Sequence, residues 1–194
     1  MEKTNYFILL VSALLIFSTL TAQTDSSGIY KTAEDFQNRK LAYAINYKTE
    51  MHKINADLLF NDKEVKVKHH DTTYKLLKSN TYGYRNMKGE EFRFVDNKEY
   101  KILNPAEPLI IYVYQNPVHS TKGEQKYVPV YFFSTDAASP PQPLTKANLK
   151  AAFPDNHTFH DKLDEQFKAD NELYAYDNFH KIYKLNRLLQ NSNK

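Results

Sequence analysis

Apolar and polar residues alternate along the chain from residue 41 to residue 133, and short turn sequences interrupt the alternation. A period of two puts one face of each segment against a core, which predicts β-strands. The expected strands are 54–60, 64–68, 73–77, 81–86, 91–95, 99–103, 109–114 and 127–133. Dipeptides such as Asn61-Asp62 and Asp96-Asn97 suit tight turns between strands. We therefore expect an antiparallel β-meander of about seven to nine strands.

Two of these strands have features that predict their places in the sheet. The segment 109–114 reads Leu-Ile-Ile-Tyr-Val-Tyr and is apolar on both faces, which is typical of a central, covered strand. The segment 127–133 contains Pro129, whose nitrogen cannot donate a hydrogen bond to a neighbouring strand. We therefore expect this last strand to lie at an edge of the sheet or to contain a bulge.

The hydrophobic period lengthens after the strand region, which predicts helices. A proline-rich crossover at 139–143 leads to Thr145, the expected N-cap of a short helix that ends at Phe153. A second helix is expected to begin after Asp155 or Asn156, either of which can serve as its N-cap.

A third helix is predicted from about residue 171 to residue 189. At about 100° per residue, its positions form one broad apolar arc. The arc contains Ala175, Tyr176, Phe179, Ile182, Tyr183 and Leu189. Asn186 lies inside the same arc. Because a buried amide needs hydrogen-bond partners, we expect Asn186 to bind the backbone or a tyrosine hydroxyl and to fix how the helix docks.

Together these elements predict an α+β protein, in which a short N-terminal helix and a cluster of three C-terminal helices pack on the meander. The N-terminal helix is expected from Thr32 to about Arg39, because Thr32 and Asp35 have the spacing of a capping box. The expected parts of the mature chain are a flexible lead-in at 23–28 and a single domain at 29–194, β-rich over 41–133 and helical over 145–190.

The first 22 residues have the pattern of a secretory signal peptide. Lys3 precedes an apolar run from Tyr6 to Phe17, and the small residue Ala22 suits the cleavage position. The alternative is a retained membrane anchor, but the run is shorter than the roughly 20 residues that span a bilayer. We expect cleavage after Ala22, no stable membrane insertion of the mature chain, and an extracytoplasmic location in the periplasm or the medium.

The composition narrows what such an exported protein can be. The chain has no cysteine, so we expect it not to be a lipoprotein, and disulfides and cysteine metal sites are excluded. Only four of its 26 basic residues are arginine, and 23 acidic residues are mixed with them. Because arginine best recognises phosphates and bases, we expect no nucleic-acid partner. With only four glycines there is no phosphate-cradling loop, and we expect no cofactor.

The best candidate for chemistry is His157-x-x-His160-x-x-x-Asp164 on the second C-terminal helix. Positions three and four apart share a helix face, so two imidazoles and a carboxylate could bind zinc there. A fourth ligand is missing, and in the alternative reading His160 flanks the core while His157 is solvated. A second cluster, His69-His70-Asp71, would need a distorted strand, because adjacent strand residues point to opposite faces.

Aromatic residues suggest a binding surface. The chain has 15 Tyr and 12 Phe but no Trp. Tyr82 and Tyr84 should share one face of a strand, with Gly83 leaving a shallow spot on the other face. An exposed pair could stack on a sugar or bind a peptide, which makes Tyr82, Tyr84 and Arg85 candidate ligand-binding residues. The alternative is structural, with the rings inward and the hydroxyl groups at the rim.

Several segments are similar to those of one protein family. They are Gly28–Phe36, Tyr82-Gly83-Tyr84-Arg85, Phe92-Arg93-Phe94, Glu99–Leu103, Leu144–Leu149, Ala152–Asn156 and Tyr176-Asp177-Asn178-Phe179-His180-Lys181-Ile182-Tyr183-Lys184. With them the chain resembles a family of small exported proteins of Bacteroidota-type bacteria over nearly all of its mature length. The resemblance implies a cell-envelope or secreted setting. It supplies no activity and no functional residue.

Two classes of function remain open. We expect a non-enzymatic exported cell-envelope protein that binds a partner protein or an envelope ligand, because no complete catalytic constellation can be identified from spacing. The alternative is a small hydrolase or metal-dependent enzyme that uses His157 and His160.

Overall fold

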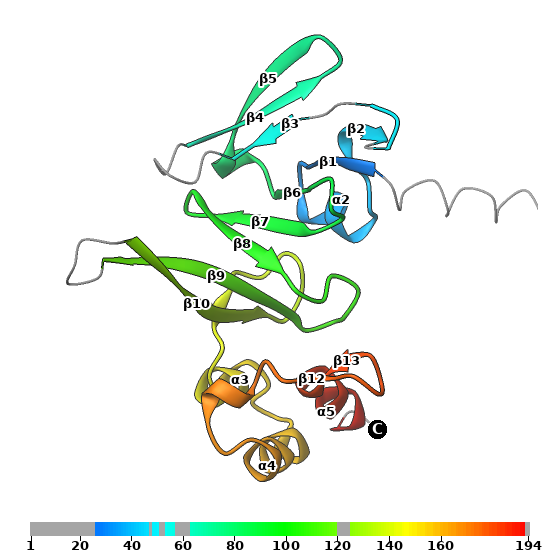
Figure 1. The fold of residues 1–194 in the computed structure, drawn as a ribbon. Coiled ribbons are helices and arrows are strands. Elements are labelled where there is room, and N and C mark those ends of the chain that lie inside the picture. Colours follow the sequence, from blue (N-terminus) through cyan, green and yellow to red (C-terminus); the bar gives the residue numbers. More distant parts are fainter. Residues whose placement is uncertain (1–25, 47, 51–52, 57–62, 120–124, 193–194) are drawn as a thin grey trace, which may run out of the picture.

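The fold is built around a curled, eight-stranded antiparallel sheet with the order β11-β10-β9-β8-β7-β6-β1-β2 (Figure 1). The computed structural model describes residues 26–46, 48–50, 53–56, 63–119 and 125–192. The strands of the sheet are β1 (Ser26–Tyr30), β2 (Ala42–Asn46), β6 (Gly83–Arg85), β7 (Glu91–Val95), β8 (Lys98–Ile102), β9 (Ile110–His119), β10 (Gln125–Ser134) and β11 (Gln142–Pro143). The expected combination of helices with an antiparallel sheet is confirmed. The expected signal peptide lies outside the described residues.

The meander is present from β6 to β10, where each strand pairs with the next one along the chain. Asp96 and Asn97 have positive φ angles of 50° and 62°, as a type I′ turn requires, so the predicted tight turn between β7 and β8 is confirmed. Strand β1 was not among the expected strands, and it lies between β6 and β2. Ser26 to Gly28 were expected in a flexible lead-in, but they belong to this strand.

A separate sheet contains β3 (Lys53–Asn55), β4 (Glu64–His69) and β5 (Thr72–Leu77), which were expected within the meander. Val65 and Val67 of β4 are buried and pack with Ile29 and Phe94 of the large sheet. The small sheet therefore covers part of the large one instead of extending it. The predicted Asn61-Asp62 turn lies outside the described residues.

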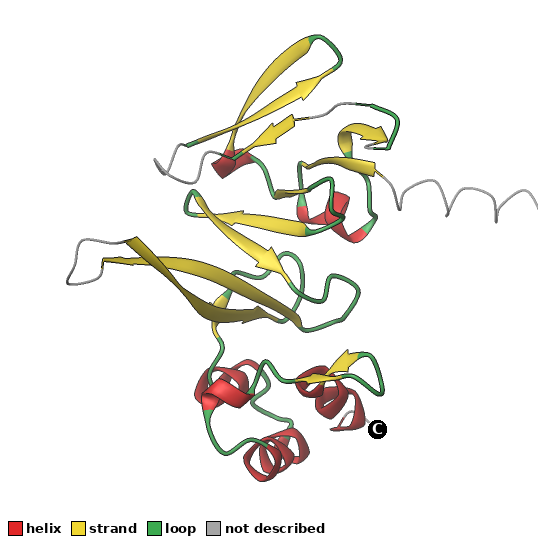
Figure 2. Ribbon diagram, viewed as in Figure 1, coloured by secondary structure: helices red, strands yellow, loops and turns green. Residues whose placement is uncertain are grey.

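Four α-helices are described: α2 (Ala33–Gln37), α3 (Lys146–Ala152), α4 (His157–Gln166) and α5 (Lys184–Ser192) (Figure 2). The predicted caps are confirmed. Thr32 and Asp35 form a reciprocal capping box at α2. The side chains of Thr145 and Asn156 accept amide hydrogen bonds at the starts of α3 and α4. No helix in the described part of the chain is long and apolar enough to cross a membrane.

The predicted third C-terminal helix is wrong over most of its length. The segment contains a 3₁₀ turn (Asp170–Glu172), then a hairpin of β12 (Tyr176–Asp177) and β13 (Ile182–Tyr183), and only then α5. The carboxylate of Asp177 accepts the amides of Phe179 and His180, and this local bonding competes with a helix. Lys181 has a positive φ of 55°, which also breaks helical continuity.

The helices pack on the sheet through one apolar cluster that joins strand residues to all three C-terminal helices. Its buried members are Leu109, Ile111, Phe133, Leu144, Leu149, Phe159, Leu163, Phe167, Leu173, Leu185, Leu188 and Leu189. Asn186 lies among them and is 1% exposed. Its Oδ1 accepts the amide of Leu109 at 3.2 Å and its Nδ2 donates to the carbonyl of Leu109 at 2.9 Å. The prediction that Asn186 binds the backbone is confirmed.

Strands β9 and β10 form a long ribbon that extends past its neighbours. They pair with each other along ten residues, but β8 reaches only Tyr112 and Val113, and β11 reaches only Phe132 and Phe133. The outer part of β10 is therefore an edge among the described strands. This confirms the prediction made from Pro129.

A proline interrupts each edge of this ribbon. The carbonyl of Tyr131 accepts a hydrogen bond from the residue after β11, so alternate residues of β10, including Pro129, direct their backbone polar groups to that edge. The carbonyl of Ile111 accepts a hydrogen bond at the β8 side, and the same alternation directs Pro117 there. Each edge thus lacks an amide hydrogen where an added strand would need one.

Replacing Pro129 with valine is expected to promote self-association. The ribbon exposes Tyr127, Val128 and Val130, and a restored amide would complete a β-edge next to these apolar side chains. Light scattering across a concentration series should show larger species for Pro129→Val. Pro140→Val changes an exposed loop proline and serves as the control. Equal masses for the two variants at every concentration would show that Pro129 does not protect this edge.

Candidate functional site

The tyrosine platform predicted from the sequence is absent, because both rings are buried. Tyr82 and Tyr84 are each 8% exposed. Tyr82 stacks on Phe36, whereas Tyr84 packs with a different core cluster and its hydroxyl donates to Glu99 at 2.7 Å. A Cβ atom at Gly83 would lie 1.9 Å from the carbonyl oxygen of Phe92, so the expected shallow spot is filled by backbone. Both rings lie inward, as the structural alternative expected, but the hydroxyl group of Tyr82 is buried and not at the rim. Arg85 is half-buried.

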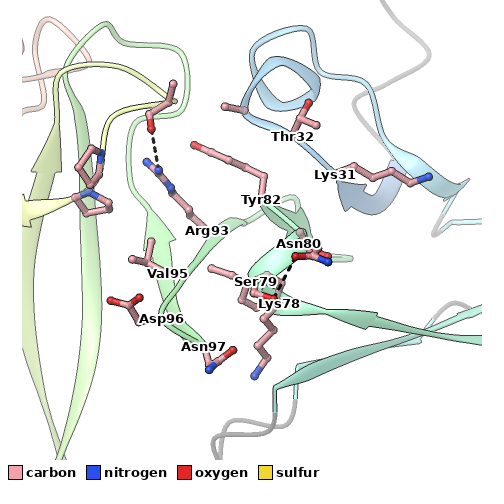
Figure 3. A pocket seen from close by; sticks show the side chains of 16 residues that line it. Lys31, Thr32, Lys78, Ser79, Asn80, Tyr82, Arg93, Val95, Asp96 and Asn97 are labelled. Carbon is pink, nitrogen blue, oxygen red and sulfur yellow. Dashed lines mark hydrogen bonds between the residues drawn. The ribbon is translucent and has the colours of Figure 1, made fainter.

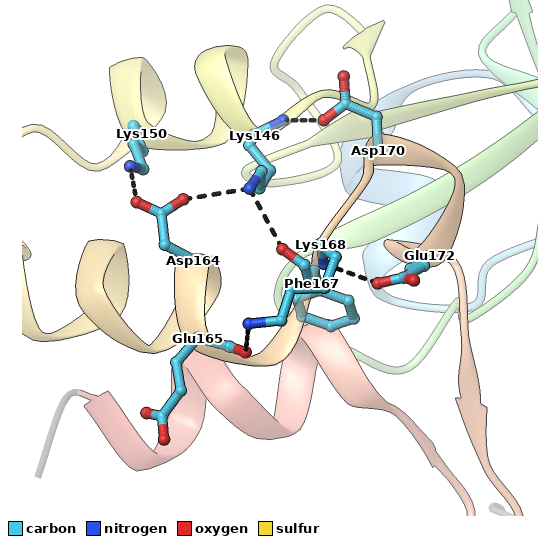
Figure 4. Close-up of polar contacts among 8 residues, drawn as sticks. All are labelled: Lys146, Lys150, Asp164, Glu165, Phe167, Lys168, Asp170 and Glu172. Atoms are coloured by element: carbon cyan, nitrogen blue, oxygen red, sulfur yellow. Dashed lines mark hydrogen bonds and ion pairs between the residues drawn. The ribbon is translucent and has the colours of Figure 1, made fainter.

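The predicted metal triad is also not assembled. The rings of His157 and His160 are neighbours, with centroids 5.9 Å apart, but Nε2 of His160 donates to the carbonyl of Phe153 at 2.9 Å. Asp164 binds Lys150 at 2.5 Å and Lys146 at 3.3 Å, so its carboxylate joins α4 to α3 (Figure 4). Among the described residues no group of three or more metal-binding side chains could hold an ion.

Asp164→Asn is expected to lower the melting temperature at neutral pH and to have little effect in strong acid. The hydrogen bond from Lys150 is the main cause that holds the pKa of Asp164 below its ordinary value. A lowered folded-state pKa stabilises the protein above the unfolded-state pKa, and this contribution disappears as the pH falls through the folded-state pKa. Melting curves of both proteins from pH 7 to pH 2 test this. A difference in melting temperature between the two proteins that stays constant with pH would contradict the ion-pair role of Asp164.

The distorted strand required by the second histidine cluster does occur. His70 has a positive φ of 50° in the β4–β5 turn, and its ring centroid lies 4.2 Å from that of His69. Tyr43 packs edge-on against His69 at 6.0 Å. The described residues place no third metal-binding side chain with this pair. The cluster is therefore an aromatic contact between the two sheets.

A surface hollow of about 660 Å³ lies between α2, the β7–β8 turn and the loop before β11 (Figure 3). Three cationic residues line it, Lys31, Lys78 and Arg93. Arg93 donates to the carbonyl of Ser139 at 2.9 Å and lies over the ring of Tyr82. The ammonium groups of Lys31 and Lys78 point away from Arg93 (Figure 3). Arg93 therefore fastens the loop before β11 to the sheet, and the ammonium groups of Lys31 and Lys78 lie over the rings of Tyr43 and Phe94.

A buried carboxylate, Glu91, and a half-buried one, Glu99, have structural partners. Glu91, 4% exposed, accepts hydrogen bonds from Arg39 at 2.6 Å and from the hydroxyl of Tyr30 at 3.1 Å. Burial is the main cause that raises the pKa of Tyr30 to about 12, and burial also raises the pKa of Glu99, which Tyr84 binds. Neither carboxylate lines the hollow. Their bonds connect strands, and they present no reactive group to a cavity.

The remaining candidate is the β12–β13 apex, which we define as residues 177–181. Oδ1 of Asp177 accepts the amide of Phe179 at 3.0 Å and the amide of His180 at 3.1 Å. Its Oδ2 binds Nδ1 of His180 at 2.8 Å and Nη1 of Arg187 at 2.7 Å. The hydrogen bonds from His180 are the largest influence that holds the pKa of Asp177 well below its usual range. One carboxylate thus orders the apex and joins it to α5.

The apex presents a large apolar side chain to solvent. Phe179 is 88% exposed, more than any other large hydrophobic residue among those described. The hairpin beneath it is held by ring contacts: Tyr176 packs on Tyr183 with centroids 5.1 Å apart, and Tyr174 stacks on Tyr131 of β10 at 3.7 Å. Phe179 is therefore an exposed aromatic side chain on a fixed support, and buried aromatic side chains are frequent anchors of protein interfaces.

Helical periodicity concealed this site in the sequence. It placed Tyr176, Phe179 and Tyr183 in one apolar arc directed at the core. The signal that could have revealed the apex is Asp177-Asn178, because these residue types favour turns by bonding to the backbone two or three residues ahead. No protein-family model matches the chain, and comparison with curated proteins and with solved structures finds nothing similar to it.

Proposed function

We propose that this chain is an exported cell-envelope protein without enzymatic activity, and that it binds another protein through the β12–β13 apex. The observation that carries the proposal is Phe179, 88% exposed at the tip of an ordered loop. Burial of an exposed phenylalanine by a partner is favourable. Because Asp177 already orders the loop, less entropy is lost on binding and more of this energy remains as affinity.

The proposed setting rests on the sequence. The signal-peptide pattern of the first 22 residues and the resemblance to exported proteins of Bacteroidota-type bacteria support the periplasm or the medium. The absence of cysteine supports a mature protein without a lipid anchor.

The positions of the side chains around His157 and His160 do not favour the alternative, a hydrolase or metal-dependent enzyme that uses these two residues. His160 is bonded to the backbone and Asp164 to two lysines, so a reaction at His157 and His160 has neither a third ligand nor an oriented base among the described residues. Binding by the apex needs no further group.

Site-specific photocrosslinking in the native host tests the proposal directly. The photoreactive analogue benzoylphenylalanine is placed at position 179 of the full chain, and in a control protein at the exposed position Tyr127. We expect one crosslinked polypeptide that is specific to position 179. Crosslinks that are identical at the two positions, or no crosslink at position 179, would refute binding through the apex.

Phe179→Ala is expected to weaken binding of the crosslinked protein, once purified, by about tenfold or more, because a central aromatic anchor commonly contributes about 2 kcal/mol. Asp177→Asn keeps the phenylalanine but removes the carboxylate charge that binds His180 and Arg187, so we expect a smaller loss. Calorimetric titration measures both values, with Tyr127→Ala as the control. An unchanged affinity for Phe179→Ala would contradict the role of the anchor.

A further inference from the structure

We infer that the partner presents an apolar pocket bordered by carboxylates, and that Phe179 enters the pocket while the cations beside it face the acidic border. This inference rests on the proposed function and specifies the chemistry of the partner. It follows from the distribution of charge around the apex and from the rigidity of the apex.

The segment that contains the apex is basic. From Tyr174 to Ser192 the chain has three basic residues, Lys181, Lys184 and Arg187, and one acidic residue, Asp177. All three basic residues are exposed. Lys184 and Arg187 are three positions apart at the start of α5, so they lie on one face of that helix. Arg187 touches Asp177, which places this helical face next to the apex.

Two acids lie at this hairpin, Asp177 within the segment and Glu107, which lies against Tyr183 and is half-buried and bound by Asn104. The side chain of Asp177 is 15% exposed and its oxygens are occupied by His180 and Arg187. Lys181 is therefore left as an exposed cation two residues from Phe179, and Lys184 as an exposed cation at the base of the same hairpin, where its amide binds Ala175. Charge complementarity then favours an acidic surface, because like charges across an interface are strongly unfavourable.

Rigidity favours a protein pocket over a lipid bilayer as the acceptor. A bilayer is fluid and accepts an aromatic side chain in many orientations, so a fixed loop brings no advantage there. A pocket of fixed shape gains affinity when the inserted group is already oriented. The apex has two amides bonded to one carboxylate and is joined to α5, as a pocket would require. Phe179 is also the single large apolar side chain of the apex, and one such side chain provides little apolar area for insertion into a membrane.

The experiment measures crosslinking from benzoylphenylalanine at position 179 in the full chain, with and without charge reversal. The test protein also contains Lys181→Glu and Lys184→Glu. The control protein contains Lys53→Glu and Lys75→Glu, two exposed lysines of the small sheet, and so has the same net charge. We expect the yield of the crosslinked polypeptide to fall roughly tenfold in the test protein and to stay near the parent value in the control. We also expect 0.5 M NaCl to reduce the parent yield, because salt screens exposed charges.

The outcomes separate this inference from the proposed function. A crosslink at position 179 that is insensitive to charge reversal and to salt would overturn the acidic border and leave binding through the apex intact. An equal loss of crosslinking yield in the test and control proteins would show that only the net charge matters, and this result would also overturn the acidic border. If no polypeptide is crosslinked at position 179, both proposals fail. Phe179-dependent sedimentation with phosphatidylcholine–phosphatidylglycerol vesicles would then identify a membrane as the acceptor.

Discussion

Replacing Arg39 with methionine is expected to lower the free energy of unfolding by about 3 kcal/mol. Glu91 is 4% exposed and Arg39 is its only cationic partner among the described residues, with Nη1 to Oε2 at 2.6 Å. Without the guanidinium, a buried carboxylate keeps only the hydroxyl of Tyr30. The same substitution releases the carbonyl of Pro105, which Arg39 also binds at 2.6 Å. Urea unfolding at neutral pH, followed by circular dichroism, measures the loss.

A double substitution shows whether the buried charge causes this loss. Arg39→Met combined with Glu91→Gln removes both charges, and we expect it to recover a large part of the stability lost in Arg39→Met alone. The control is Lys101→Met, which breaks a bridge to Glu90 of the same length, 2.6 Å, but with side chains 40% and 33% exposed. Its cost should be about 1 kcal/mol or less. Equal costs for Arg39→Met and Lys101→Met would show that burial of Glu91 adds nothing.

Asn186→Ala is expected to lower the free energy of unfolding by about 2 kcal/mol, the cost of leaving a buried donor without its partner. The amide of Leu109 loses the acceptor Oδ1 at 3.2 Å. The carbonyl of Leu109 is less affected because Asn104 also donates to it, at 2.7 Å. The loss should therefore correspond to one unsatisfied group rather than two.

The matched control for this substitution is Asn191→Ala, in the same helix but with an exposed side chain. It should change the stability by about 0.5 kcal/mol or less. Hydrogen exchange of the Leu109 amide adds a local measurement, since this amide should exchange faster in Asn186→Ala and at the parent rate in Asn191→Ala. Equal stabilities for the two variants would mean that Asn186 does not fix α5 to the sheet.

The parts of the fold that could be predicted depend on short-range chemistry. Thr32, Thr145 and Asn156 bind amides three residues ahead, so their caps can be recognised without knowledge of the rest of the chain. The Asp96-Asn97 turn requires positive φ angles that these residue types tolerate. Pro129 marks an edge because of a missing hydrogen atom, which is a property of one residue.

The parts that could not be predicted depend on contacts between distant segments. The place of β1 between β6 and β2 is set by residue pairs such as Ile29 with Tyr84. The residues of such a pair are far apart in the sequence, so a local hydrophobic pattern does not predict their pairing. For Tyr82 and Tyr84 an exposed pair and a structural pair both remained open, because alternation fixes the face of a strand but not what covers it. The candidate site was missed for the opposite reason: local bonding at Asp177 overrode a helical pattern that was present in the sequence.

The hydrogen bonds between Asn186 and Leu109 join residues 77 positions apart, and this separation has a consequence for the order of folding. Closing such a distant contact costs chain entropy, which only the surrounding apolar cluster can offset. Leu185, Leu188 and Leu189 complete that cluster from the last twelve residues of the chain. The interior between sheet and helices therefore closes only after α5 is available, so a chain that has been made only as far as α4 still lacks the contacts that would lock it into its folded form.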